Sequence, residues 1–173
     1  MDHNIFLVGF MGAGKSTVGR RLARHLGYRF ADLDDLIVAR EGMPIPEIFA
    51  RKGEAAFRDS EAAVLSGLGR SSRAVFATGG GIVGRAENRL LMKERGIVVY
   101  LRASWPVLEQ RLARESGRPL ADPQKGMAAI RALWESRLAW YEEADIVIDT
   151  DRLPVDGVVR AIAAHLDQEG KTS

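Results

Sequence analysis

The feature that most restricts the fold is a glycine-rich segment near the N-terminus, Gly9-Phe10-Met11-Gly12-Ala13-Gly14-Lys15-Ser16. It matches the phosphate-binding pattern G-x-x-x-x-G-K-[ST] and lies between an apolar run at residues 5–8 and a helical pattern at residues 18–26. In such loops, backbone N–H groups and the positive end of the helix dipole surround phosphate oxygens. We therefore predict a strand, a phosphate-binding loop and a helix, in that order.

This loop predicts that the chain binds ATP or GTP. Lys15 is expected to reach the β- and γ-phosphates, and Ser16 is expected to ligate Mg²⁺. The alternative is an ordinary glycine-rich turn in which Lys15 and Ser16 are solvated residues at a helix start. The match between the pattern and its strand-loop-helix context favours the nucleotide site.

The rest of the chain alternates short β-rich runs with longer helical segments. Strands are expected at residues 30–34, 74–78, 97–101 and 145–149. Helices are expected at residues 35–40, 45–52, 54–68, 87–95, 106–112 and 155–166, and a further helix is expected to end at about residue 141. This alternation favours βαβ units and a mostly parallel, buried sheet. Residues 114–127 lack periodicity and contain Gly117, Pro119, Pro123 and Gly126, which predicts a mobile loop.

Length and composition predict one α/β domain over residues 1–173, with a frayed tail at residues 168–173. The chain contains no cysteine, which suits a reducing cytoplasm. We find no signal-peptide pattern and no apolar run long enough to cross a bilayer. With 25 basic and 23 acidic residues, charge gives no case for a nucleic-acid partner.

Two acidic residues, Asp32 and Asp34, are predicted at the C-terminal end of the second strand. Side chains two apart on a strand share a face, and ligands collect at this edge of parallel sheets. One carboxylate could then support a metal ion, and the other could orient or deprotonate an attacking hydroxyl. Helix-capping acids before the segment 36–38 are an equally good interpretation of the pair alone.

A possible acceptor site involves Arg58, within a helical pattern, and Gly79-Gly80-Gly81, after the third strand. An arginine side chain can bind a carboxylate through two parallel hydrogen bonds, which suits an anionic substrate. Three glycines allow a ligand to approach backbone N–H groups closely. Taken singly, a solvated helix charge and a plain tight turn are the commoner explanations.

A set of short motifs follows in order along the chain: Gly9 to Ser16, Asp32-Leu33-Asp34, Gly53 to Arg58 with Glu61, Gly79-Gly80-Gly81, Arg118-Pro119-Leu120, and Arg137. This set resembles the motif series of the shikimate kinase family, from residue 5 to about residue 162. The resemblance implies a nucleoside-monophosphate-kinase-like P-loop fold. That fold is a three-layer α/β/α sandwich around a five-stranded parallel sheet, with a substrate-binding region at about 33–61 and a mobile lid at about 112–127.

The resemblance also implies an activity, namely transfer of the ATP γ-phosphoryl group to the 3-hydroxyl of shikimate by a cytoplasmic, monomeric enzyme that uses Mg²⁺. It assigns catalysis to Asp34, Lys15 and Arg118, and metal binding to Ser16 and Asp32. The implied shikimate-binding residues are Asp34, Arg58, Gly79, Gly80, Gly81 and Arg137. The implied ATP-binding residues are Gly12, Ala13, Gly14, Lys15, Ser16, Thr17, Arg111, Arg118, Arg152 and Pro154.

Two other functions fit part of the sequence. A gluconate kinase would keep the ATP loop but has less use for the glycine triplet joined to Arg58 and Arg137. The second alternative is a ligand sensor that has the same fold but has lost turnover. Lys15, Asp34 and Arg118, which the resemblance assigns to catalysis, are intact and disfavour this alternative. A panel of acceptor acids distinguishes all three functions.

Overall fold

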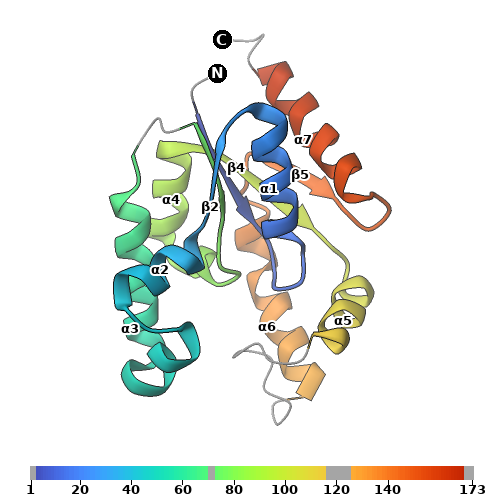
Figure 1. The fold of residues 1–173 in the computed structure, drawn as a ribbon. Helices are drawn as coiled ribbons and strands as arrows, with labels where there is room; N and C mark the ends of the chain where they lie inside the picture. The colour runs from blue at the N-terminus through green and yellow to red at the C-terminus, as the bar shows by residue number, and fades with distance from the viewer. Residues whose placement is uncertain (1–2, 70–72, 116–125, 170–173) are drawn as a thin grey trace.

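The structure, a computed structural model, describes residues 3–69, 73–115 and 126–169. Across these residues the strands form one parallel sheet in the order β2-β3-β1-β4-β5 (Figure 1). The strands are β1 (Asn4–Val8), β2 (Arg29–Asp32), β3 (Ala74–Ala77), β4 (Gly96–Arg102) and β5 (Ile146–Asp149). The helices are α1 (Lys15–Leu26), α2 (Leu33–Glu41), α3 (Ile45–Gly67), η1 (Ile82–Gly84), α4 (Ala86–Arg95), α5 (Trp105–Arg114), α6 (Gly126–Tyr141) and α7 (Val155–Glu169).

Helices cover both faces of this sheet, which gives the predicted three-layer arrangement. Helices α1 and α7 lie side by side on one face, and α4 and α6 lie on the other (Figure 1). Every residue of β1 is buried, because β1 pairs with β3 on one side and with β4 on the other. Burial on both faces explains why residues 5–8 of β1 and the whole of β3 are continuous apolar runs without alternation.

The parallel strands bring the loops after them to one edge of the sheet. The phosphate-binding loop follows β1, α2 follows β2, and the glycine turn Gly79–Gly81 follows β3. Helix α5 follows β4 on the other side of β1. Because β1 lies at the point where the strand order reverses, a ligand crevice is expected at this edge.

The predicted strands are confirmed to within a residue or two, with one consequential exception. The second strand ends at Asp32, and α2 begins at Leu33. The prediction that Asp32 and Asp34 share a strand face is therefore wrong. Asp32 is instead the N-cap of α2, and its Oδ1 accepts a hydrogen bond from the backbone N–H of Asp34 (3.0 Å). The capping interpretation was correct for Asp32, since aspartate satisfies the free N–H groups of a first turn.

Helix α3 is interrupted at Gly53. Gly53 has φ 83° and ψ 172°, so the backbone leaves the helical region there and α3 consists of two halves. The expected helices at residues 45–52 and 54–68 are thus confirmed. Ile37, Ile48 and Phe57 form a small core of their own beneath α2 and α3, separate from the main core around the sheet.

At the C-terminal end, α7 continues through Gln168, which we expected to lie in a frayed tail, and residues 170–173 lie outside the described part of the chain. None of the helices in the described ranges combines the length and apolar character that a bilayer span requires.

Candidate active site

A cavity of about 640 Å³ opens at the C-terminal edge of the sheet. It is bounded by the phosphate-binding loop, the start of α2, both halves of α3, the glycine turn, α5, α6 and the segment after β5. Its lining includes most of the predicted site residues: Gly12, Ala13, Gly14, Lys15, Ser16, Thr17, Asp32, Asp34, Arg58, Gly79, Gly80, Gly81, Arg111 and Arg137. The structure therefore brings the predicted nucleotide and acceptor residues into one space.

The phosphate-binding loop reaches its shape through positive-φ glycines, with φ 81° at Gly12 and 90° at Gly14. Gly14 caps α1 and has no side chain, so no side-chain cap engages the N–H groups of the first turn. Lys15 Nζ donates to the carbonyl oxygens of Gly9 (2.7 Å) and Phe10 (2.9 Å). The ammonium group is thus held over the loop, with the helix dipole beneath it.

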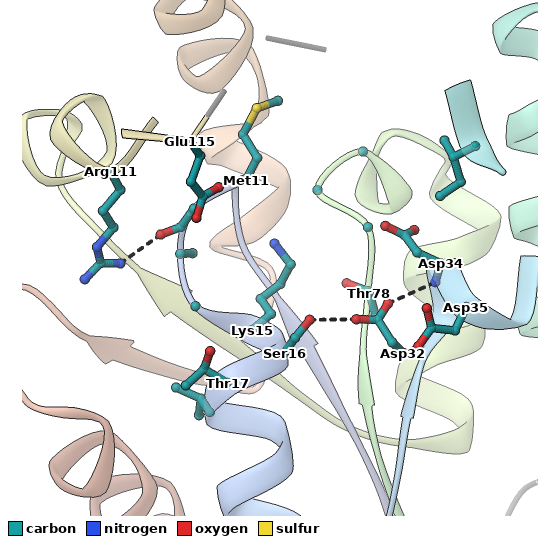
Figure 2. Close-up of a pocket in the computed structure, with 18 of the residues that line it drawn as sticks. Met11, Lys15, Ser16, Thr17, Asp32, Asp34, Asp35, Thr78, Arg111 and Glu115 are labelled. Carbon is teal, nitrogen blue, oxygen red and sulfur yellow. Dashed lines mark hydrogen bonds between the residues drawn. The ribbon is translucent and has the colours of Figure 1, made fainter. Parts of the chain in front are cut away.

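Beside this loop, Ser16 and Asp32 point toward each other (Figure 2). Ser16 Oγ donates to Asp32 Oδ2 over 2.6 Å. A hydroxyl and a carboxylate oxygen are the hard ligands that Mg²⁺ prefers, and that ion usually completes its shell with water and substrate phosphate. The Ser16 hydroxyl and the Asp32 carboxylate are two such oxygen donors on adjacent elements, so the pair fits this role.

Asp34 lies in the first turn of α2, on the cavity wall opposite the phosphate-binding loop. The Asp34 carboxyl group packs closely against the glycine turn. A Cβ atom at Gly79 would lie 3.3 Å from Asp34 Oδ1 and 3.0 Å from Glu61 Oε1. The two carboxyl groups therefore converge on Gly79, and a glycine there leaves them room.

Arg58 comes from the second half of α3 and packs directly on the glycine turn. Its Nη1 donates to Glu61 Oε2 (3.0 Å), and a Cβ atom at Gly81 would lie only 2.3 Å from Arg58 Nη2. The Glu61 side chain is 1% exposed. Burial raises the pKa of Glu61 because the carboxylate loses water, and the neighbouring Arg58 guanidinium opposes that rise.

Glu61 was given no role from the sequence. Its distance of three residues from Arg58 on a helix was the available signal, since side chains at that spacing meet on one helix face. Phe49 and Phe57 on α3 line the cavity with apolar surface. Phe49 was not singled out from the sequence, and Phe57 lies in the motif Gly53 to Arg58 but was given no role of its own.

Arg137 comes from α6 and is 6% exposed. Its guanidinium lies over the Phe10 ring, 5.7 Å from the centroid, and close to Gly80. Among the described residues, Arg137 Nη1 is buried without a hydrogen-bond acceptor. One turn later, Tyr141 Oη donates to the Gly80 carbonyl, and burial raises the pKa of that phenol, which keeps the donor protonated. The site therefore offers buried positive charge with donor capacity to spare.

On the nucleotide side, Arg111 of α5 donates to the Gly12 carbonyl oxygen (2.9 Å; Figure 2). Arg152 and Pro154, which the resemblance also assigns to ATP binding, are exposed and flank Leu153, which lines the cavity. Arg118 and most of the predicted lid lie outside the described residues, between the end of α5 and the start of α6.

Replacing Gly81 with alanine tests whether the glycine turn seats the Arg58 guanidinium. The added Cβ would overlap Arg58 Nη1, Nη2 and Cζ, all within 2.6 Å, so the side chain must leave its position. We expect the KM for the acceptor acid to rise about tenfold, the value of one charged hydrogen bond, with the KM for ATP unchanged. Gly84→Ala is the matched control, because its Cβ would meet only Trp140 at 3.8 Å. Equal effects of the two substitutions would contradict this seating.

The family model described as shikimate kinase matches residues 11–167. The chain belongs to the shikimate kinase family. A shikimate kinase of Geobacter sulfurreducens is 49% identical over 163 residues, which cover 94% of this chain and 90% of that protein. One of Bordetella pertussis is 47% identical over 166 residues, covering 95% of this chain and 79% of that protein.

Solved structures agree with this membership. A shikimate kinase from Acinetobacter baumannii, determined in complex with shikimate, has a TM-score of 0.90 and 40% identity, covering 96% of this chain and 94% of that one. A gluconokinase from Sinorhizobium meliloti has a TM-score of 0.59 and 21% identity, covering 99% and 95% of the respective chains, which shows a shared fold alone. This shikimate kinase family member is therefore an ATP-dependent kinase with the P-loop α/β fold that its sequence predicted.

Proposed function

We propose that this enzyme transfers the γ-phosphoryl group of ATP to the 3-hydroxyl of shikimate, giving shikimate 3-phosphate and ADP. One observation carries the proposal: the phosphate-binding loop shares a single cavity with two arginines, Arg58 and Arg137, that meet the same glycine turn from different helices. The relative from Acinetobacter baumannii, solved with shikimate, supports this choice of acceptor.

The acceptor region comprises α2 and most of α3, together with the glycine turn. Arg58 and Arg137 hold the shikimate carboxylate, because guanidinium groups match its planar geometry and Arg137 Nη1 is a buried donor. Phe49 and Phe57 provide apolar surface for the ring carbons. This division of the wall into cationic and apolar parts fixes the orientation of the ring, so that one hydroxyl faces the nucleotide.

In the transfer step, the 3-hydroxyl oxygen bonds to the γ-phosphorus while the bond from that phosphorus to the β–γ bridging oxygen breaks. Asp34 accepts the hydrogen bond of the attacking hydroxyl and takes its proton. Lys15 moves from the carbonyl oxygens of Gly9 and Phe10 to the β- and γ-phosphates. Positioning and charge neutralisation account for most of the catalysis in such transfers. Arg118 of the predicted lid adds a positive charge at the γ-phosphate.

Magnesium is part of this proposal because the Ser16 hydroxyl and the Asp32 carboxylate form a pair of hard oxygen donors beside the phosphate-binding loop. Ser16 would ligate the ion directly, and Asp32 would hold it directly or through water. When bound, the ion neutralises charge on the β- and γ-phosphates. Asp32 keeps its other oxygen on the α2 N-terminus, so the same carboxylate orients both the metal site and the helix that carries Asp34.

An acceptor panel tests the proposed function. We expect ADP release, measured in a coupled assay with Mg²⁺ and ATP, in the presence of shikimate and not of gluconate or nucleoside monophosphates. Quinate, a related carboxylated ring, is included as the closest chemical competitor. Activity restricted to gluconate would replace the proposal with a gluconate kinase. Binding of shikimate without ADP release would favour a sensor.

We further propose that the enzyme is a cytoplasmic monomer, as the resemblance to the shikimate kinase family implies; the absence of cysteine suits that compartment. Light scattering in the presence of both ligands should then give a mass near 19.0 kDa.

A further inference from the structure

The two halves of α3 carry different parts of the acceptor wall. The first half contributes Ile45, Pro46 and Phe49, and the second half contributes Phe57, Arg58 and Glu61. Between them lies Gly53, whose backbone is not helical. The apolar wall and the arginine thus face one ligand only if the angle between the two halves is fixed.

Glu41, the last residue of α2, makes hydrogen bonds on both sides of this break. Its Oε2 accepts from Lys52 Nζ (2.6 Å), immediately before Gly53, and its Oε1 accepts from Ser60 Oγ (2.6 Å), two turns after it. The Glu41 side chain is 13% exposed, and Ser60 is buried. These hydrogen bonds lower the pKa of Glu41, that of Lys52 first and that of Ser60 second, which keeps the carboxylate ionised.

Apolar packing alone does not specify the angle at Gly53. The small core of Ile37, Ile48 and Phe57 lies between the elements, but hydrophobic contact is not directional. Gly53 itself has no Cβ, and nothing lies within 4 Å of where one would be. The two hydrogen bonds of Glu41 are directional and charge-assisted, which makes them suited to fix orientation.

We infer that Glu41 is a positioning residue for the acceptor. By accepting hydrogen bonds from Lys52 and Ser60 across the break at Gly53, it fixes the position of Phe49 in the first half of α3 relative to Arg58 in the second half. This inference rests on the proposed function for the identity of the acceptor. Glu41 does not line the cavity, so its effect on the ligand is exerted through the two halves of α3.

Replacing Glu41 with alanine removes both hydrogen bonds. We expect the KM and the calorimetric Kd for shikimate to rise about tenfold, as for loss of a charged hydrogen bond, while kcat and the KM for ATP stay within about twofold. Glu41→Gln keeps an acceptor for Ser60 and should give an intermediate value. The matched control is Glu47→Gln, which breaks the Arg51–Glu47 ion pair (2.8 Å) inside the first half without crossing Gly53.

A second readout needs no acceptor at all. In the free enzyme, Glu41→Ala should speed hydrogen exchange of amides 45–52 relative to those of α4, and Glu47→Gln should do so much less. If Glu41→Ala fails to fold, Lys52→Met and Ser60→Ala each remove one of the two hydrogen bonds. Each should reproduce part of the loss of shikimate affinity and part of the faster amide exchange. Unchanged exchange and unchanged shikimate affinity in these variants would overturn the inference. Failure of the wild-type enzyme to phosphorylate shikimate would instead overturn the proposed function, because the exchange result does not depend on it.

Discussion

Replacing Asp34 with asparagine is expected to lower kcat by about 10²- to 10⁴-fold, the usual contribution of a positioned general base. Asparagine keeps the shape of the side chain and can still accept a hydrogen bond, but it cannot take a proton. The backbone N–H that Asp34 donates to Asp32 Oδ1 is unaffected, so α2 keeps its cap. The KM for ATP should change little, because the proposed ATP contacts lie across the cavity.

Steady-state kinetics at saturating shikimate, with circular dichroism to confirm folding, measures this effect. Asp35→Asn is the control, since Asp35 is the next residue of α2, is exposed and borders the same cavity. A variant Asp34→Asn with near-normal turnover would remove Asp34 from the proton-transfer step. An equal loss of kcat in Asp35→Asn would indicate instead that the negative charge of the first turn of α2, and not proton transfer to Asp34, supports turnover.

Replacing Arg58 with methionine is expected to weaken both the binding of shikimate and the fold. The KM for shikimate should rise on the order of 100-fold, because one of two guanidinium groups proposed for its carboxylate is lost. The same change leaves Glu61 buried beside an apolar side chain. Removing one partner of a buried ion pair costs about 3–5 kcal/mol of unfolding free energy at neutral pH.

The pH dependence of that destabilisation identifies its cause. Burial already raises the pKa of Glu61, and without the Arg58 charge it should rise further. A carboxyl group with a raised folded-state pKa binds its proton more tightly in the folded than in the unfolded chain. Its stabilising contribution is therefore complete below the unfolded-state pKa and is lost as the pH rises through the folded-state pKa. Arg58→Met should thus approach wild-type stability in acid and fall further below it as the pH rises.

Urea unfolding at several pH values, with the double variant Arg58→Met/Glu61→Gln, completes the test. The neutral amide removes the uncompensated charge, so the double variant should recover much of the stability at neutral pH while shikimate binding stays weak. Stability and binding would then be separated in one pair of proteins. A pH-independent loss in Arg58→Met would mean that packing, and not the charge of Glu61, is responsible.

The sequence predicted the strand, glycine loop and helix at the N-terminus and the positions of the later strands correctly, because both depend on local patterns. Glycines at the residues that need positive φ, followed by lysine and serine at a helix start, leave few alternative structures. Asp32 and Asp34 show the limit of such reasoning. Alternation along a strand placed them on one face, whereas the preference of aspartate for an N-cap ended the strand earlier and brought them together through a backbone hydrogen bond.

Contacts between distant segments were beyond local patterns. That Arg58 rests against Gly81, or that Tyr141 bonds the Gly80 carbonyl, depends on how α3 and α6 pack around the sheet. The three glycines indicated close approach of another group to the backbone. They did not indicate that the group at Gly81 is the Arg58 side chain. The bridge from Glu41 to Lys52 and Ser60 joins residues up to 19 apart and has no signature in periodicity.

The hydrogen bonds of Lys15 to Gly9 and Phe10 bear on how readily ADP departs. In the proposed mechanism, the ammonium group, which already has carbonyl acceptors, exchanges them for phosphate oxygens when the nucleotide arrives and takes them back afterwards. Only the difference between the two sets contributes to affinity. The vacated loop is thereby stabilised, which limits how strongly spent nucleotide can be retained between one catalytic cycle and the next.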